Sequence, residues 1–584
     1  MARSGTRMSQ AARPAVGSLA SVALALCVLN LLLAHGNAWP TIWPALEWRL
    51  ALELAPAVAL IAAWGVLYGR VPRRLQVALA VLGTLWVVLH YIDVTVPAML
   101  GRRINVYWDA PHLGAVVRMG GREGLSAQAL LAVLGAMLLL ALLYVIVRRC
   151  IALLARGAEQ GAGRILMLTF AGATLALWLS PGLIGRPAAH TFAPTVTGML
   201  AEQYRLLSTA LSRTAGVERL GPGPAFTGTL AGLDGADVLI VFAEAYGAVT
   251  LDRPEIARAL DSHRNKLADA ITASKRQVVS ARLVSPTFGG ASWLAHASLL
   301  SGLDMRDPTD YQLLLTTKRP TLVRHFTANG YRTVGWLPGI QLPWPEGAFY
   351  GFERYADAGR IGYTSRPFGF WRIPDQASMA LIHAQEFGGD FRSAYDASAA
   401  PGTDTANAAD SARTGNASSP SPRSAIAGAA VRQPRLIVFP TVTTHAPFRA
   451  LPPYRDDWAR LLGPEAFTAD EVDAVEAVPT SWSDPLPAYL ASMRYQFDWL
   501  TDYLARYAQA NLVTIVIGDH QPIGSVSGPG QPWDVPVHVI ASNPVLLERF
   551  ASAGFVAGLV PPTTPLGPTH ALTPILIDAF GRTD

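Results

Sequence analysis

Cysteine is almost absent from the sequence, since only Cys27 and Cys150 occur among 584 residues. Cys27 lies within an apolar run and Cys150 directly follows another, so no disulfide framework supports a globular part. Charged residues are also scarce, at 15%, whereas 51% of the residues are hydrophobic. A chain of this length and composition is too long for one ordinary domain and too apolar to be wholly soluble. The composition therefore predicts a membrane part joined to a globular part.

A continuous basic stripe is lacking too, although the formal net charge is +5. The arginines instead collect in short loops beside apolar runs, which is typical of membrane proteins and not of nucleic-acid binding. We therefore expect no nucleic acid partner.

Five apolar stretches are long enough to cross a bilayer, which takes roughly 20 helical residues. They lie near residues 16–34, 52–67, 75–100, 127–147 and 165–184. Three sets of arginines fall on one side of these spans: Arg3, Arg7 and Arg13; Arg70, Arg73 and Arg74; and Arg148, Arg149, Arg156 and Arg164. Because cytoplasmic loops retain arginine, the amino terminus is expected in the cytoplasm. Everything after about residue 185 then lies outside, which for the inner membrane of a double-membrane bacterium is the periplasm.

The predicted transmembrane domain covers residues 1–190. A cleaved signal peptide is the alternative for the first span, but no convincing small-residue cleavage site follows it. A connector is expected at residues 191–236, where PTVTGMLAEQYRLLSTALSR has apolar residues at helical spacing. This pattern predicts a helix that lies along the membrane surface.

Residues 237–584 alternate strands rich in Val and Ile with helical stretches, which predicts an α/β domain with a central, mostly parallel sheet. Strands are expected at 238–242, 277–284, 332–336, 435–440, 513–518 and 537–541, and helices at 253–272, 294–300, 321–329 and 487–508. Residues from about 393 to 433 are dominated by Ala, Ser, Asp, Gly, Pro and Thr and lack periodicity. They predict a disordered insertion whose deletion spares activity.

Two acidic motifs stand at the ends of predicted strands. FAEAYG places Glu244 after VLIVF, and IGDHQP places Asp519 and His520 after LVTIVI. Open α/β sheets carry their chemistry at the carboxyl ends of strands, and carboxylates with an imidazole are ligands for hard or borderline metal ions. The two motifs therefore predict a metalloenzyme held at a membrane.

The order of these motifs resembles the alkaline phosphatase superfamily, in its sulfatase-like branch of membrane-anchored transferases. That branch includes lipoteichoic acid synthases and lipid A phosphoethanolamine transferases, and the resemblance runs from the five spans to nearly the end of the chain. It implies a sulfatase-like catalytic domain in which Glu244, Asp519 and His520 bind one divalent ion, Mn or Zn.

The resemblance also implies a nucleophile in SWLAHASLLSG. Ser292 has the family's spacing to Ser301 and Gly302, and would be both nucleophile and metal ligand. A hydroxyl at a helix start lies in the positive field of the helix amino terminus, which suits a phosphorylated intermediate. The family usually has Thr at this position, and Thr287 in SPTFGG is the second candidate.

Two further segments match the family's substrate-contacting residues. VFPTVTTHAPF resembles the strand whose following histidine contacts the transferred phosphate or protonates the leaving group, here His445. PFGFWRIPDQ resembles a segment that contacts substrate with an aromatic residue and an arginine, here Trp371 and Arg372. Ordinary roles stay open at four positions: a turn cap for Glu244, a helix cap for Ser292, a turn histidine for His445 and a structural arginine for Arg372.

The chain departs from typical sulfatases, which carry a paired acid after the first strand and a C/S-x-P-x-R segment. Here these positions read Glu244-Ala245 and Ser292-Trp293-Leu294-Ala295-His296. An unmodified serine favours phosphoryl transfer, so we expect a phosphoglycerol or phosphoethanolamine headgroup to move from a membrane phospholipid donor, through the serine, to an envelope glycan or lipid acceptor. The alternatives are a phosphatase, phosphodiesterase or sulfatase that uses water, and a catalytically inactive envelope scaffold.

Overall fold

The computed structural model describes residues 12–38, 41–100, 104, 106–109, 127–180, 191–211, 217–341, 344, 346–369, 372–389, 391, 432–481 and 483–581. The chain divides into two compact units, Met1–Ala215 and Gly216–Asp584. Trp371 lies outside the described residues, and so does the predicted insertion at 393–433 except for Arg432 and Gln433.

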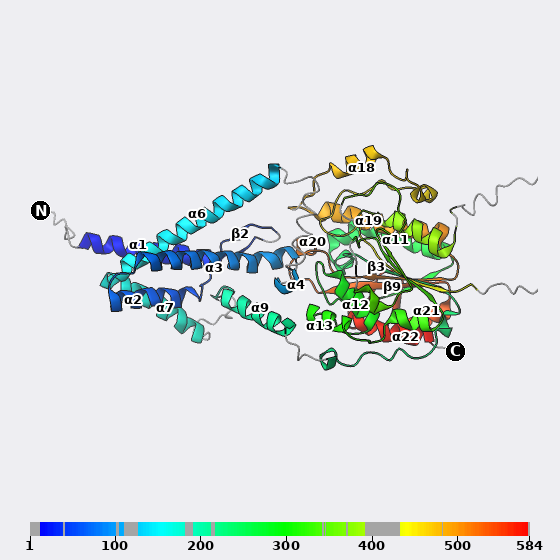
Figure 1. Cartoon of the computed structure of the whole chain (residues 1–584), viewed down its shortest axis with the longest axis horizontal. Helices are drawn as coiled ribbons and strands as arrows, with labels where there is room; N and C mark the ends of the chain where they lie inside the picture. The colour runs from blue at the N-terminus through cyan, green and yellow to red at the C-terminus, as the bar shows by residue number, and fades with distance from the viewer. Residues whose placement is uncertain are drawn as a thin grey trace, which may run out of the picture. The chain divides into compact units, whose positions relative to one another are not determined.

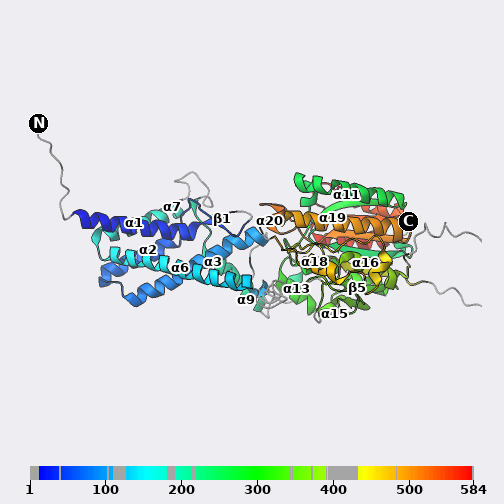
Figure 2. The same ribbon diagram turned by 90° about the horizontal axis from the view of Figure 1, so that it is seen from above.

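The first unit is helical. Its helices are α1 (Ala12–Ala34), α2 (Leu54–Tyr68), α3 (Arg73–Leu100), α4 (Val106–Asp109), α6 (Ala127–Ala158), α7 (Gly161–Leu179) and α9 (Val196–Leu211). Figure 2 shows α1, α2, α3 and α6 running lengthwise along this unit. Glycines allow their backbones to approach closely, because a Cβ on Gly65 of α2 would lie 2.3 Å from the carbonyl oxygen of Ala158 in α6.

Three helical segments are long and apolar enough to cross a membrane: Arg73–Met99, Val133–Ala158 and Gly161–Leu179. They overlap the third, fourth and fifth predicted spans, and the second of them extends 11 residues beyond the predicted end at residue 147. The first two predicted spans correspond to shorter apolar helices, Ser18–Ala34 and Leu54–Tyr68. The second of these stops because Gly69 takes a left-handed φ of 77°. The described residues therefore contain three helices that are long and apolar enough to cross a membrane, and the total of five spans stays a prediction.

The helix predicted in the connector is present as α9. Its amino terminus is fixed by Glu53, whose carboxylate accepts hydrogen bonds from the backbone N–H groups of Val196, at 3.1 Å, and Thr197, at 2.7 Å. Its position along the membrane surface stays a prediction.

The second unit is built on an eight-stranded sheet in the order β10-β4-β9-β8-β3-β7-β5-β6. The strands are β3 (Asp237–Ala243), β4 (Gln277–Val284), β5 (Arg332–Leu337), β6 (Arg354–Asp357), β7 (Arg435–Pro440), β8 (Leu512–Gly518), β9 (Asp534–Ala541) and β10 (Val556–Ala557). All six predicted strands are found, whereas the short edge strands β6 and β10 were not predicted.

The sheet is mixed, with four parallel and three antiparallel strand pairs, which agrees with the expectation of a mostly parallel sheet. Strands β8, β3, β7, β5 and β6 run parallel to their neighbours within this group. Strand β9 is antiparallel to both β8 and β4, and β10 is antiparallel to β4. A strand that is buried on both faces reads as one apolar run in either direction, and all eight residues of β9 are buried.

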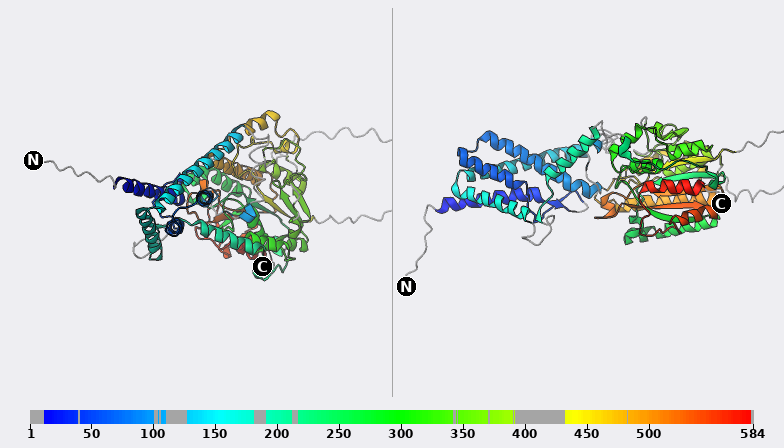
Figure 3. Two further views of the ribbon diagram at one scale, coloured as in Figure 1. Left: turned by 60° about the vertical axis from the view of Figure 1, so that its left-hand side comes forward. Right: turned by 90° about the horizontal axis from the view of Figure 1, so that it is seen from below.

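Helices cover both faces of the sheet (Figure 1). One layer contains α11 (Pro254–Ala273), α16 (Asp375–Ile382) and α19 (Leu486–Asp502), and the other contains α12 (Ser292–Ser301), α14 (Leu322–Ala328), α21 (Pro544–Ser552) and α22 (Leu572–Gly581). Figure 2 shows α11 beside α19, and Figure 3 (right) shows red α22 on the opposite face. Along β3, Leu239 and Val241 face the first layer, whereas Val238 and Ile240 face the second.

Five further α-helices of this unit have four to eight residues. They are α10 (Val249–Asp252), α13 (Pro308–Leu315), α15 (Gly347–Tyr350), α18 (Ala469–Glu476) and α20 (Gly524–Ser527). The four predicted helices correspond to α11, α12, α14 and α19, the last of which continues as a π-helical turn at Tyr503–Tyr507.

Candidate metal centre

Three neighbouring parallel strands end at the same edge of the sheet and supply the site. Strand β3 lies between β8 and β7. Glu244 follows β3, Asp519 and His520 follow β8, and Thr441 follows β7. The backbone N–H of Glu244 donates to Thr441 Oγ1 at 2.9 Å, which joins two of these strand ends. Residues that are 275 positions apart in the sequence therefore converge because their strands pair in register, with Ala243 opposite Gly518.

The glycines of the two motifs make this convergence possible. A Cβ on Gly518 would lie 1.9 Å from the carbonyl oxygen of Tyr246, and one on Gly247 would lie 1.9 Å from Gln521 Oε1. Any side chain at either position would separate the ends of β3 and β8.

Glu244, Asp519 and His520 form a compact and buried group. Each offers one ligand atom, and these atoms all lie within 4.8 Å of one another. His520 Nε2 is 3.3 Å from Glu244 Oε1 and 3.8 Å from Asp519 Oδ1. The three residues are 6%, 1% and 2% exposed. Among the residues that the structure describes, this is the group of His, Cys, Asp and Glu side chains able to hold a metal ion.

The donor atoms suit a divalent cation. His520 Nδ1 lies 2.7 Å from the carbonyl oxygen of Gln521, so Nδ1 carries a proton, and Nε2, which faces the carboxylates, is the nitrogen that would bind a metal ion after losing its proton. Asp519 Oδ1 accepts the backbone N–H groups of Ala245, at 2.9 Å, and His520, at 2.7 Å. Its other oxygen, Oδ2, is buried without a hydrogen-bond partner among the described residues. A buried carboxylate oxygen of this kind requires a proton or a cation.

Ser292 brings a hydroxyl into the same group. It is the first residue of α12, and its Oγ donates to Glu244 Oε2 at 2.9 Å and lies 3.1 Å from His520 Nε2. It makes no helix-capping bond, because Ala291 occupies the N-cap position. The other candidate, Thr287, directs its hydroxyl to the carbonyl oxygen of Gly290 in its own loop, at 2.5 Å. The structure thus brings together Glu244, Ser292, Asp519 and His520, and leaves Thr287 apart.

Two alanines with left-handed backbone flank this group. Ala245 has a φ of 55° and Ala291 a φ of 62°. For a residue with a Cβ this conformation costs roughly 1–2 kcal/mol, and it occurs mostly where a functional group must be aimed. Ala245 directs its N–H toward Asp519, and Ala291 sets the start of the helix that presents Ser292.

The charges in the site strongly influence one another. Burial acts to raise the pKa of Glu244, but the neighbouring His445 and His520 outweigh it and lower the pKa. Burial and the negative charge of Glu244 raise the pKa of Asp519 well above its usual range. Burial acts to lower the pKa of His520, but the carboxylates of Asp519 and Glu244 raise it to about 9. Two buried carboxylates that repel each other favour an added positive charge, as a divalent ion would provide.

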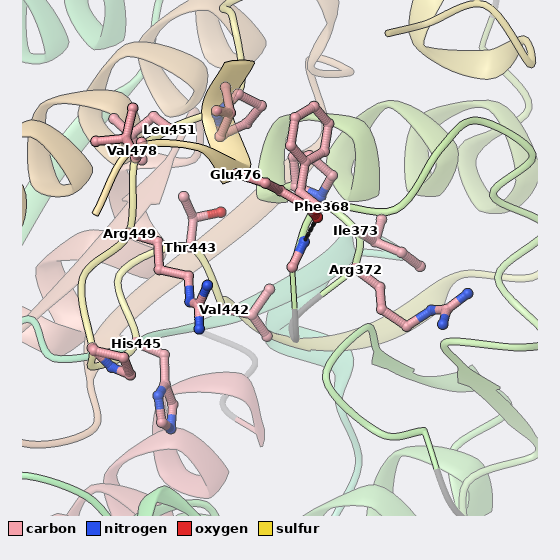
Figure 4. Close-up of a pocket in the computed structure, with 16 residues that line it drawn as sticks. Phe368, Arg372, Ile373, Val442, Thr443, His445, Arg449, Leu451, Glu476 and Val478 are labelled. Carbon is pink, nitrogen blue, oxygen red and sulfur yellow. Dashed lines mark hydrogen bonds between the residues drawn. The ribbon is translucent and has the colours of Figure 1, made fainter. Parts of the chain in front are cut away.

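His445 lies on the loop after β7 and lines a pocket (Figure 4). It is close enough to Glu244 to lower the pKa of that carboxyl. Its Nδ1 faces the carbonyl oxygen of Ala446, so Nδ1 carries a proton. The hydroxyl of Thr444 donates to the carbonyl oxygen of Glu244 at 2.6 Å, which fixes the loop to the end of β3.

Arg372 lines the same pocket, but its side chain is exposed and its guanidinium points away from His445 in Figure 4. The arginine whose side chain extends toward His445 is Arg449, which the sequence reasoning missed. Arg449 could have been considered from the sequence, because it lies only four residues after His445 on the same loop.

A scan against protein-family models finds no match, and a search of curated proteins finds none either. Among solved structures, the lipoteichoic acid synthase LtaP from Listeria monocytogenes is similar at 12% identity over 57% of this chain and 70% of that chain, with a TM-score of 0.29. A protein in the alkaline phosphatase superfamily from Vibrio parahaemolyticus is similar at 11% identity over 64% of this chain and 73% of that chain, with a TM-score of 0.32. Neither similarity assigns a role to any residue of this chain.

Proposed function

We propose that this protein transfers a phospho-headgroup, phosphoglycerol or phosphoethanolamine, from a membrane phospholipid to an envelope glycan or lipid, with Ser292 as the nucleophile. The observation that carries the proposal is the position of the Ser292 hydroxyl, within hydrogen-bond distance of both Glu244 and His520. A serine in a group of potential metal ligands fits the chemistry of an activated nucleophile.

Glu244, Asp519, His520 and Ser292 would hold one divalent ion, Mn or Zn. When bound, that ion lowers the energy of the serine alkoxide and neutralises phosphate oxygens. Mixed oxygen and nitrogen donors fit either metal.

In the first half of the reaction, Ser292 Oγ forms a bond to phosphorus and the bond from phosphorus to the diacylglycerol oxygen breaks. The hydroxyl proton of Ser292 leaves to solvent, and protonated His445 donates a proton to the departing oxygen. The start of α12 directs its backbone N–H groups and the positive end of its dipole at the phosphate that is now bound to Ser292.

In the second half, a hydroxyl of the acceptor attacks the same phosphorus and gives its proton to neutral His445. The bond from phosphorus to Ser292 Oγ breaks, and Ser292 regains a proton from solvent. Both histidine and serine return to their starting states.

The membrane helices support a lipid donor, because a soluble ester would not require such an anchor. We propose five spans, with the amino terminus in the cytoplasm of a bacterium and Gly216–Asp584 in the periplasm, on the basis of the arginine distribution.

Mass spectrometry of the full-length protein tests the nucleophile and the donor together. The purified protein is loaded with Mn or Zn and incubated with phosphatidylglycerol or phosphatidylethanolamine that is isotopically labelled in the headgroup. We expect a phospho-headgroup adduct on the peptide that contains Ser292, and none in Ser292→Ala. An adduct on the Thr287 peptide, or no adduct with either lipid, would contradict the proposal.

The same incubation separates transfer from hydrolysis. Transfer yields a labelled glycan or lipid when acceptor is added, whereas a phosphatase or phosphodiesterase releases free phosphate or a free phospho-headgroup at the same rate with or without acceptor.

A further inference from the structure

The pocket that His445 lines is small and has both polar and apolar walls. It encloses about 70 Å³, several times the roughly 10–15 Å³ that one water needs. This space is large enough for a small group such as a phosphate. His445, Thr443 and Arg449 come from the loop after β7, Phe368 and Gly369 from a hairpin, and Glu476 from the end of α18.

The hairpin determines which arginine faces the pocket. Phe368 and Arg372 exchange two backbone hydrogen bonds of 2.9 Å, which closes a very tight turn. Gly369 and Arg372 both have positive φ, 48° and 60°. This turn sends the side chain of Arg372 outward, as Figure 4 shows. It also leaves Gly369, which has no side chain, in the wall of the pocket.

Arg449 packs against that glycine. A Cβ on Gly369 would lie 3.7 Å from Arg449 Cδ and 3.9 Å from Arg449 Nη1. The N–H of Gly369 donates to Glu476 Oε1 at 2.8 Å, drawn as a dashed line in Figure 4. The stem of Arg449 is therefore supported by a backbone segment that is itself held by Glu476.

The loop that carries Arg449 is fixed to the residues around Glu244. The N–H groups of Val442 and Thr443 donate to the buried carboxylate of Asp375 at 2.8 and 2.9 Å. Phe448, next to Arg449, is buried against Tyr489, with ring centroids 5.1 Å apart. The hydroxyl of Tyr489 donates to the carbonyl oxygen of Ala245 at 2.9 Å, directly after Glu244. This anchoring gives Arg449 a defined position relative to the metal ligands.

We infer that Arg449 and His445 form an anion subsite that binds oxygens of the substrate phosphate, and that Arg449, not Arg372, is the substrate-binding arginine. A planar guanidinium binds two phosphate oxygens at once, which a lysine cannot do. The ligand class is a tetrahedral phosphate, either within a headgroup ester or free. The inference rests on the proposed function only for the identity of the ester.

Binding is measured by calorimetry on the full-length, metal-loaded protein, with inorganic phosphate, glycerol 1-phosphate and O-phosphoethanolamine as probes. Arg449→Met keeps the aliphatic stem against Gly369 and removes the charge. We expect it to weaken binding of all three probes by about 10- to 100-fold, since a charge-assisted hydrogen-bonded pair is lost. Arg449→Lys should recover part of the affinity. Arg372→Met, the matched control from the same pocket, should bind within about twofold of the unmodified protein.

The inference is overturned if Arg449→Met and Arg449→Lys bind as tightly as the unmodified protein, or if Arg372→Met weakens binding as much. If Arg449→Lys and Arg449→Met lose the same amount of affinity, the planar guanidinium with its paired N–H donors is needed for binding, and a positive charge alone is not enough. Tighter binding of one ester than of inorganic phosphate identifies the headgroup as the source of the anion. Because these probes require no turnover, their outcome is independent of whether an adduct forms on Ser292.

Discussion

At the scale of single residues, the metal-binding group explains why its four members have the identities they do. Asp519 Oδ1 joins the chain after β8 to the chain after β3, whereas its Oδ2 is buried without a hydrogen-bond partner among the described residues. His520 has its tautomer set by the carbonyl oxygen of Gln521. A serine at a helix start is ordinarily a cap, yet Ser292 bonds to Glu244 instead.

Metal affinity should depend on pH through His520. Its pKa of about 9 without metal means that a proton competes with the ion for Nε2, so affinity should rise about tenfold for each pH unit between pH 6.5 and 8.5. Titration of Mn into the metal-free protein at several pH values measures this slope. An affinity that stays constant over that range would exclude His520 as a ligand that must lose a proton.

The structure brings Glu244, Asp519 and His520 together and directs the Arg372 side chain away from His445. Glu244, Asp519 and His520 were found because strand ends and acidic residues are both visible in a sequence. The direction of the Arg372 side chain depends on a turn in which Gly369 and Arg372 itself adopt positive φ. Such a turn cannot be predicted from a periodic pattern of apolar residues.

At the scale of elements, the pairing of β9 with its neighbouring strands buries the histidine His538. His538 of β9 is buried between Ser280 of β4 and Tyr246, with Nδ1 2.6 Å from Ser280 Oγ and Nε2 3.0 Å from the Tyr246 hydroxyl. The hydroxyl of Ser280 donates to the carbonyl oxygen of Gly558, so His538 Nδ1–H donates to Ser280, and Nε2 accepts from Tyr246. This network accommodates only a neutral imidazole.

The network predicts a loss of stability in acid. Burial lowers the pKa of His538 to about 3, from 6.5 in the unfolded chain. Below pH 6.5 the unfolded state binds the proton first, so the free energy of unfolding should fall as the pH is lowered from 6.5 toward 3, by up to about 1.4 kcal/mol per unit from this group. His538→Gln should make the slope shallower in denaturant unfolding of the metal-free protein. An identical slope in the unmodified protein and in His538→Gln would refute the role of His538.

The order of elements was predictable where apolar runs alternate with helical patterns, as for β3, β7 and β8. The direction of β9 could not be predicted. Its sequence VPVHVIA is buried on both faces and has no residue pattern that distinguishes a parallel from an antiparallel neighbour. The edge strands β6 and β10 have four and two residues, which is too short for a period-2 pattern.

At the scale of the whole molecule, two compact units of different chemistry share one chain. The first buries apolar side chains between helices, including Val22, Val58 and Leu154. The second surrounds a mixed sheet and presents its ligands at one edge. We expect a lipid-anchored reaction because a metal-binding group and membrane helices occur together.

The predicted insertion should be dispensable for activity. We expect that replacing residues 394–430 with a short Gly/Ser linker leaves headgroup transfer within about twofold, since Glu244, Ser292, Asp519 and His520 all lie outside this segment of the sequence. Arg432 must be kept, because it pairs with the buried carboxylate of Asp237 at the start of β3. Extending the replacement through Arg432 should lower stability by about 1–3 kcal/mol. Loss of activity in the shorter replacement, with stability retained, would contradict this expectation.

The metal content of the protein tests the account most directly, because the proposed transfer reaction requires a divalent ion at Glu244, Asp519 and His520. Elemental analysis of the purified full-length protein should find one Mn or Zn per chain. The ion should be lost in Asp519→Asn, and kept in Asp534→Asn, which changes a buried acid at the start of β9. An unmodified protein that is active without bound metal, or an Asp519→Asn protein that retains a full equivalent, would show that these residues do not form a metal centre.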